Sequence, residues 1–152
     1  MKRWIGSLAT GVVLFTLVSL ATASTPAVQG EISGVEVCIQ SVCGAAVFTG
    51  TFKGTVGGNP TVGFFWAAVQ HEPLPNPGSS AALLSGRWNI ATPGHTFSGQ
   101  VVGGSIFNNG DNTFKIDTAL KITRGGSGLI DVAGILNHNT FPPTIEATLS
   151  QP

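Results

Sequence analysis

Hydrophobic and polar side chains alternate along residues 113–124, whose sequence is TFKIDTALKITR. Successive side chains of a β-strand point to opposite faces, so this alternation predicts a strand with one dry face and one wet face. The dry face would hold Phe114, Ile116, Thr118, Leu120 and Ile122, and the wet face Lys115, Asp117, Ala119, Lys121 and Thr123. The following strand repeats the pattern, with Ile130, Val132, Gly134 and Leu136 on its dry face.

Comparable patterns predict eight strands after residue 23, where no apolar stripe of helical spacing occurs. The predicted strands cover residues 31–40, 44–56, 61–71, 80–92, 95–107, 113–124, 127–138 and 143–150. The earlier dry faces would hold Phe48, Phe52, Leu84, Trp88, Ile90, Phe97, Val101 and Phe107. The third strand contains TVGFFWAAVQ, which is apolar on both faces. This strand therefore either lies under a loop or carries an exposed contact patch.

The links between the predicted strands are short and rich in turn-forming residues, and only EPLPNPGSS is a long loop. Short links make successive strands antiparallel neighbours, which predicts an all-β, up-and-down meander. An even number of strands lets the first and last pair, so the eight-stranded meander can close into a barrel. A two-sheet β-sandwich is the alternative. We expect residues 24–152 to form this single domain.

The N-terminus has the pattern of a secretory signal peptide. A basic start, MKR, precedes a short apolar run, and ATA at residues 21–23 supplies a small-residue cleavage site. A membrane anchor is the alternative, but the uninterrupted apolar run is short for a span. We therefore expect residues 1–23 to be cleaved, the mature protein to be secreted or periplasmic, and no stable membrane span to remain.

The charge of the mature chain is low. Lys2 and Arg3 lie in the predicted signal, whereas all seven acidic residues follow it, so residues 24–152 carry a net charge of −2. No basic patch is available to neutralise phosphates, which argues against a nucleic-acid partner.

Cys38 and Cys43 are the two cysteines of the chain. In an exported protein they are expected to form one disulfide, which would pin the link between the first two strands. A redox role is the alternative, but the C-x4-C spacing differs from the C-x-x-C of that chemistry.

The turns of a meander alternate between its two ends, so residues far apart in sequence are predicted to share a rim. One rim would hold His71, Glu72, Asp111, Asn137 and His138, and the other His95 and Arg124. His138 continues the dry face of its strand and could look into the barrel mouth. The rim residues could be ordinary surface residues, the mouth of a small-ligand site, or a metal site made by His71, Glu72 and His138. Because no local spacing supplies the ligands that zinc needs, we predict no metal and no cofactor.

Trp66 and Trp88 lie on apolar faces of their predicted strands. Core packing is the usual role of such residues, and stacking on a ligand is the alternative. The face assignment puts four acids on the outer surface: Glu36, Asp117, Asp131 and Glu146.

The last third of the chain, LKITRGGSGLIDVAGILNHNTFPPTIEATLS, resembles the C-terminal strands of small exported barrels of the allene oxide cyclase and dirigent type. The shared features are a strand, a glycine-serine turn and a strand rich in small residues. The resemblance implies an eight-stranded barrel with an apolar cavity, in whose enzymes internal polar groups guide cyclisation or coupling. The predicted outward position of the acids departs from that arrangement.

Three functions follow from these observations. The first is a binding module for a small apolar ligand, with His71, Glu72, His138, Trp66 and Trp88 as candidate rim and interior contacts. The second is a structural or surface-interaction protein with a filled core. The third, implied by the resemblance, is a cyclase or isomerase. No catalytic residue is assigned, because no nucleophile elbow or positioned triad is recognisable.

Overall fold

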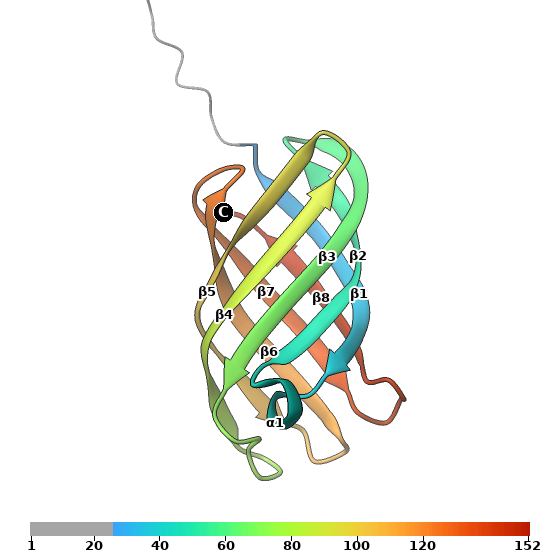
Figure 1. Ribbon diagram of the computed structural model, residues 1–152, viewed down its shortest axis with the longest axis vertical. Coiled ribbons are helices and arrows are strands. Elements are labelled where there is room, and N and C mark those ends of the chain that lie inside the picture. Colours follow the sequence, from blue (N-terminus) through green and yellow to red (C-terminus); the bar gives the residue numbers. More distant parts are fainter. Residues whose placement is uncertain (1–25) are drawn as a thin grey trace, which may run out of the picture.

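The computed structural model describes residues 26–152, which form one closed antiparallel barrel with the strand order β1 to β8 (Figure 1). The predicted signal peptide lies outside the described residues. The strands are β1 (Val28–Cys38), β2 (Ala46–Val56), β3 (Asn59–His71), β4 (Ser80–Thr92), β5 (His95–Asn108), β6 (Thr113–Arg124), β7 (Leu129–Asn137) and β8 (Thr144–Ser150). Because β1 pairs with β8, the predicted barrel is confirmed and the sandwich is not formed.

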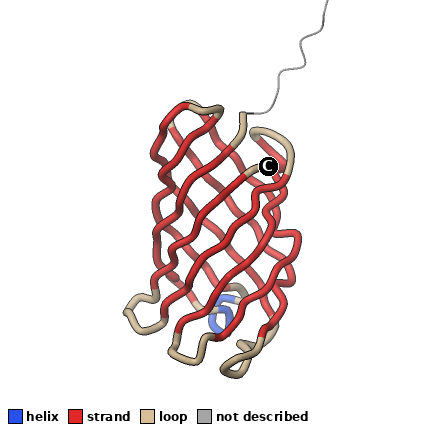
Figure 2. Tube along the Cα trace, turned by 180° about the vertical axis from the view of Figure 1, so that it is seen from behind, coloured by secondary structure: helices blue, strands red, loops and turns tan. Residues whose placement is uncertain are grey.

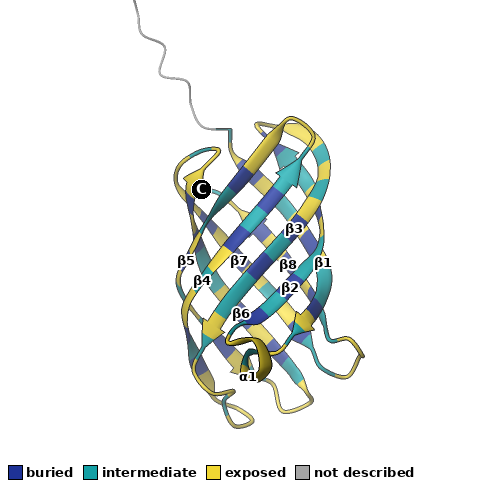
Figure 3. Cartoon of the chain, in the orientation of Figure 1, coloured by how far each residue is buried: buried dark blue, intermediate teal, exposed yellow. Residues whose placement is uncertain are grey.

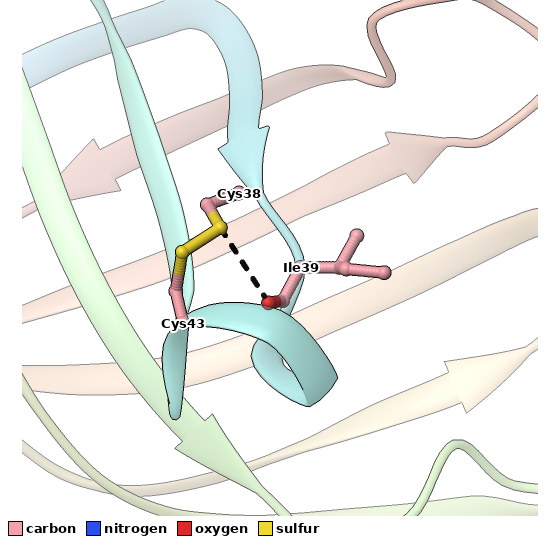
Figure 4. The surroundings of a disulfide bond; sticks show 3 residues. All are labelled: Cys38, Ile39 and Cys43. Atoms are coloured by element: carbon pink, nitrogen blue, oxygen red, sulfur yellow. Dashed lines mark hydrogen bonds between the residues drawn. A yellow bond between two sulfur atoms is a disulfide. The ribbon is translucent and has the colours of Figure 1, made fainter.

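A short helix, α1 (Gln40–Cys43), occupies the link between β1 and β2. Gly44 ends it in the left-handed conformation, with φ of 72°, and donates its N–H to the carbonyl oxygen of Gln40. Periodicity did not predict this helix because a single turn is too short to show a repeat. The predicted disulfide between Cys38 and Cys43 is present and encloses it (Figure 4).

The links gather at two ends of the barrel, as the meander predicts. The α1 end holds α1 and the β3–β4, β5–β6 and β7–β8 loops, whereas the opposite end, here the terminal end, holds the tight turns and the C-terminus (Figure 1). The strands cross obliquely between these ends in the view from behind (Figure 2).

The inner face of the wall is apolar, and buried residues alternate with exposed ones along the strands (Figure 3). The predicted faces of β6 and β7 are confirmed: the dry-face aliphatic residues are buried, and Lys115, Asp117 and Lys121 are exposed. On β3, Val62 and Phe64 are exposed on the outer face, so this strand carries apolar side chains in contact with solvent, as one of the two alternatives predicted.

Two predicted core residues, Leu84 and Phe107, are instead exposed, because irregularities in the pairing reverse the faces of β4 and β5. The register between β3 and β4 shifts beside His71, so Leu83 is 7% exposed and Leu84 is 59% exposed. The register between β5 and β6 shifts before Gly104, so Ile106 takes the inner place expected for Phe107. One extra residue in a strand exchanges its two faces.

Glycines let β1 and β2 approach closely. Gly34 lies opposite Gly50, and Gly30 lies opposite Gly54. A Cβ atom added to Gly50 would lie 2.2 Å from the carbonyl oxygen of Ser33, and one added to Gly34 would lie 2.3 Å from that of Thr49. Because these contacts involve backbone atoms, side chains at these positions would force the strands apart.

We expect Gly50→Ala to lower the free energy of unfolding by about 1–3 kcal/mol, the usual cost of overpacking. Urea unfolding followed by circular dichroism measures this change. Thr51→Ala, on the exposed outer face of the same strand, is the control and should cost less than about 1 kcal/mol. Equal stability of Gly50→Ala and the wild type would contradict the close approach of the strands.

Candidate functional site

The α1 end of the barrel encloses a cavity of about 780 Å³. Every strand contributes at least one lining residue, and the rest belong to α1 and its flanking residues, to the β3–β4 loop and to His138 at the start of the β7–β8 loop. Most of the lining is aliphatic or aromatic. The volume lies within the range of roughly 300–1,000 Å³ that is typical of small-molecule sites.

The terminal end of the barrel is filled. Its most deeply buried side chains do not line the cavity, and they are Val28, Phe52, Ile90, Phe97, Ile130 and Leu149. They belong to strand segments near the tight turns and the termini. The interior is therefore a cup, packed at the terminal end and hollow at the α1 end.

The mouth of the cup is bordered by α1 and the β3–β4 loop, which supplies Pro73 and Leu74. The side-chain amide of Gln40 donates to the carbonyl oxygen of His71 at 2.8 Å and accepts the backbone N–H of His71 at 2.7 Å. These two bonds fasten α1 to the end of β3. The Cys38–Cys43 disulfide closes the other side of the turn, with its Cys38 sulfur 3.8 Å from the carbonyl oxygen of Ile39 (Figure 4).

Glu36 lies inside the barrel, so its predicted outward position is wrong. It shares the inner face of β1 with Val28 and Ile32, at intervals of four residues, and it is 6% exposed. The interval could have revealed this position, because residues separated by an even number share a strand face. The other three acids, Asp117, Asp131 and Glu146, are exposed as predicted.

Glu36 meets His138 at the cavity wall. The Oε2 atom of Glu36 lies 3.2 Å from the Nε2 atom of His138, which is within ion-pair distance, and neither buried atom has a hydrogen-bond partner in the described chain. The imidazole also packs against the ring of Phe114, with 5.0 Å between centroids. The backbone N–H of His138 donates to the carbonyl oxygen of Asn112, which fixes the start of the β7–β8 loop.

Burial favours the uncharged forms of both groups. It raises the pKa of Glu36 above its ordinary value of 4.5 and lowers the pKa of His138 below its ordinary value of 6.5. A single proton shared between the two groups gives either a neutral pair or an ion pair. Proton transfer between the two would leave their summed charge at zero.

Trp88 lines the cavity and is 1% exposed, and its indole Nε1 has no hydrogen-bond partner in residues 26–152. The nitrogen lies beside Gly99 of β5, 3.1 Å from the place where a Cβ atom would stand. Buried indole N–H groups usually have an acceptor, whereas this one has none in the described residues.

The remaining candidate residues have different positions. His71 lines the mouth, whereas Glu72 is exposed outside the cavity and accepts the backbone N–H of Ala82. Trp66 lies on the outer face between Thr49 and Asn89, so its predicted interior position is wrong. Across the part of the chain described, no three His, Cys, Asp or Glu side chains come together as a possible metal site.

Comparisons with protein-family models, curated proteins and solved structures give no match for this chain. Within residues 26–152, no helix is long and apolar enough to cross a membrane.

The raised pKa of Glu36 predicts a dependence of stability on pH. The folded chain binds this proton more tightly than the unfolded chain, so the stabilisation is full below pH 4.5 and is lost as the pH rises through the folded-state pKa. Relative to Glu36→Gln, which cannot ionise, the wild type should therefore lose stability as the pH rises above 4.5. Urea unfolding at a series of pH values measures this difference.

Glu146→Gln, which changes an exposed acid on β8, is the matched control and should follow the wild-type curve. Parallel curves for the wild type and Glu36→Gln would show that Glu36 is not buried in the folded chain.

Proposed function

We propose that this protein binds a small apolar ligand inside the α1 end of its barrel. The observation that carries the proposal is the one-ended cavity of about 780 Å³ with its mainly apolar lining. Transfer of apolar ligand surface from water into such a cup is favourable by roughly 25 cal/mol per Å². The structural-protein alternative assumed a filled interior, so the hollow end supports the binding function instead.

We also propose that the protein acts outside the cytoplasm. The Cys38–Cys43 disulfide supports this location, because such bridges persist in oxidising compartments. The apolar ligand would then be met in the periplasm or the external medium.

Two neighbouring alanines on β3 offer a matched test of the cavity. Ala67 is buried and lines the cup, whereas Ala68 does not line it and lies on the opposite face of the strand. The neutral apolar dye N-phenyl-1-naphthylamine is expected to bind the wild type and Ala68→Phe saturably. Ala67→Phe fills part of the cavity and should weaken binding by about tenfold or more, which corresponds to about 1.4 kcal/mol.

Fluorescence titration measures dye binding, and circular dichroism confirms that each variant is folded. Ala46→Leu, which adds volume at another lining position, serves as a second blocking variant. Equal binding by the wild type and both blocking variants would place the dye outside the cavity and refute the proposed site.

A cyclase or isomerase is the second candidate function, and the internal Glu36–His138 pair favours it. The resemblance of the C-terminal strands to allene oxide cyclases implies polar groups inside the barrel, and this pair supplies a carboxyl and an imidazole within the cavity wall. Such a pair could donate and accept protons during a redox-neutral rearrangement.

An unsaturated epoxide that cyclises spontaneously to a racemic product tests this candidate. With the wild type, chiral-phase chromatography should show an excess of one enantiomer. Glu36→Gln should slow the protein-dependent formation of that enantiomer by about a hundredfold. A racemic product with both proteins would remove the cyclase candidate and leave the binding proposal standing.

A further inference from the structure

We propose that the cavity takes an apolar amine, whose ammonium group is held by the Oε1 atom of Glu36 while its apolar tail fills the cup. This inference rests on the proposed binding function and names the chemical class of its ligand. It is carried by the open oxygen of Glu36, by the charges of the lining and by the place of Glu36 near the mouth.

The carboxyl group of Glu36 has one oxygen engaged and one oxygen open. The Oε2 atom is buried and lies 3.2 Å from the Nε2 atom of His138. The Oε1 atom accepts no hydrogen bond within residues 26–152. Unlike Oε2, it keeps some accessible surface, and because the side chain faces inward this surface borders the cavity. An oxygen in this position can accept a hydrogen bond from a molecule that enters the cup.

Oε1 is an acceptor wherever the proton between Glu36 and His138 lies. With that proton on Nε2 of His138, Glu36 is a carboxylate, and with the proton on Oε2, Oε1 is a carbonyl oxygen. The complementary ligand atom must therefore carry an N–H or O–H group. Alkanes and ethers have no such group.

The charges of the lining favour an ammonium group among these donors. Glu36, His71 and His138 are the ionisable lining residues, and no lysine, arginine or aspartate is among them. Burial lowers the pKa of His138 and so favours the neutral imidazole. An ammonium group beside an ionised Glu36 and a neutral His138 brings the summed charge of the three groups to zero. A hydrogen bond between ammonium and carboxylate is also stronger than a neutral one.

Glu36 is placed for a head group at the mouth and a tail in the cup. It lies two residues before the end of β1 at the α1 end, and the mouth residues Ile39 and Gln40 follow it. Ile32, four residues earlier on the same inner face, lines the cavity at a greater depth. An ammonium group at Oε1 can keep its other N–H groups toward the water of the mouth, which limits the cost of burying its charge.

Displacement of N-phenyl-1-naphthylamine at neutral pH tests the inference, using decane, decyl methyl ether, decanol, decanoate and decylamine. Glu36→Gln keeps an acceptor oxygen and removes the charge. It should weaken decylamine by about tenfold or more and decanol by less than about threefold. Decane and the ether should be unchanged. Because each ligand is compared between two proteins, differences in ligand solubility cancel.

Glu36→Leu removes both the acceptor and the charge. It should weaken decanol by about threefold to tenfold as well as decylamine, and leave the ether unchanged. Glu146→Gln, which changes an exposed acid on β8, is the matched control and should change none of the ligands. Circular dichroism confirms that each variant is folded.

An unchanged affinity of Glu36→Gln for decylamine would overturn the inference, as would an equal loss of affinity for decylamine and decane. Tighter binding of decanoate than of decylamine by the wild type would also overturn it. In each case saturable binding of decane would keep the proposed function. Failure of the dye and of every ligand to bind would instead refute the proposed function.

The side-chain carboxyl carbon resonance of Glu36 gives a second measurement that does not depend on a variant folding. Its titration with pH reports the pKa of Glu36. Saturating decylamine should lower this pKa, because a nearby positive charge favours the carboxylate, whereas decane should not. An equal pKa with and without decylamine would also overturn the inference.

Discussion

The backbone ladder between β1 and β8 is the constraint on which the rest of this structure depends. It joins the first strand to the last from Gln29–Ser150 to Val35–Thr144, and so removes both edges of the meander. Closure gives every strand an inside and an outside. Within this wall, the glycine pairs of β1 and β2 leave no room for a Cβ atom, because one would collide with the backbone of the neighbouring strand.

Polar groups buried inside the cup lower the free energy of unfolding, so their presence needs an explanation other than stability. Glu36 and His138 lie within ion-pair distance of each other, whereas the N–H of Trp88 has no partner in the described residues. A protein selected for stability alone would carry a phenylalanine at Trp88 and aliphatic residues at the pair. All three residues line the hollow end of the barrel.

The alternation of apolar residues was sufficient to predict the eight strands, their antiparallel order and the shared rim. It failed where a register shift exchanged the faces of a strand, as at Leu84 and Phe107, because an extra residue leaves no mark in composition. Glu36 was misplaced because its charge was given more weight than its spacing from Ile32. The cavity itself could not be predicted, since side-chain volumes do not fix the strand tilt that sets the width of a barrel.

The interior has a packed end and a hollow end, so different properties are selected in different parts of the same strands. Stability is selected at the packed end, and the shape of the cavity is selected at the hollow end. Phe52, Phe97 and Ile130 hold the barrel together without touching the cavity, whereas Ala67, Val132 and Leu136 shape it. Substitutions in the second group can remodel the cup while the packed end keeps its contacts. Under the proposed binding function, one scaffold of this design can therefore diversify its ligands during evolution at little cost to its folding.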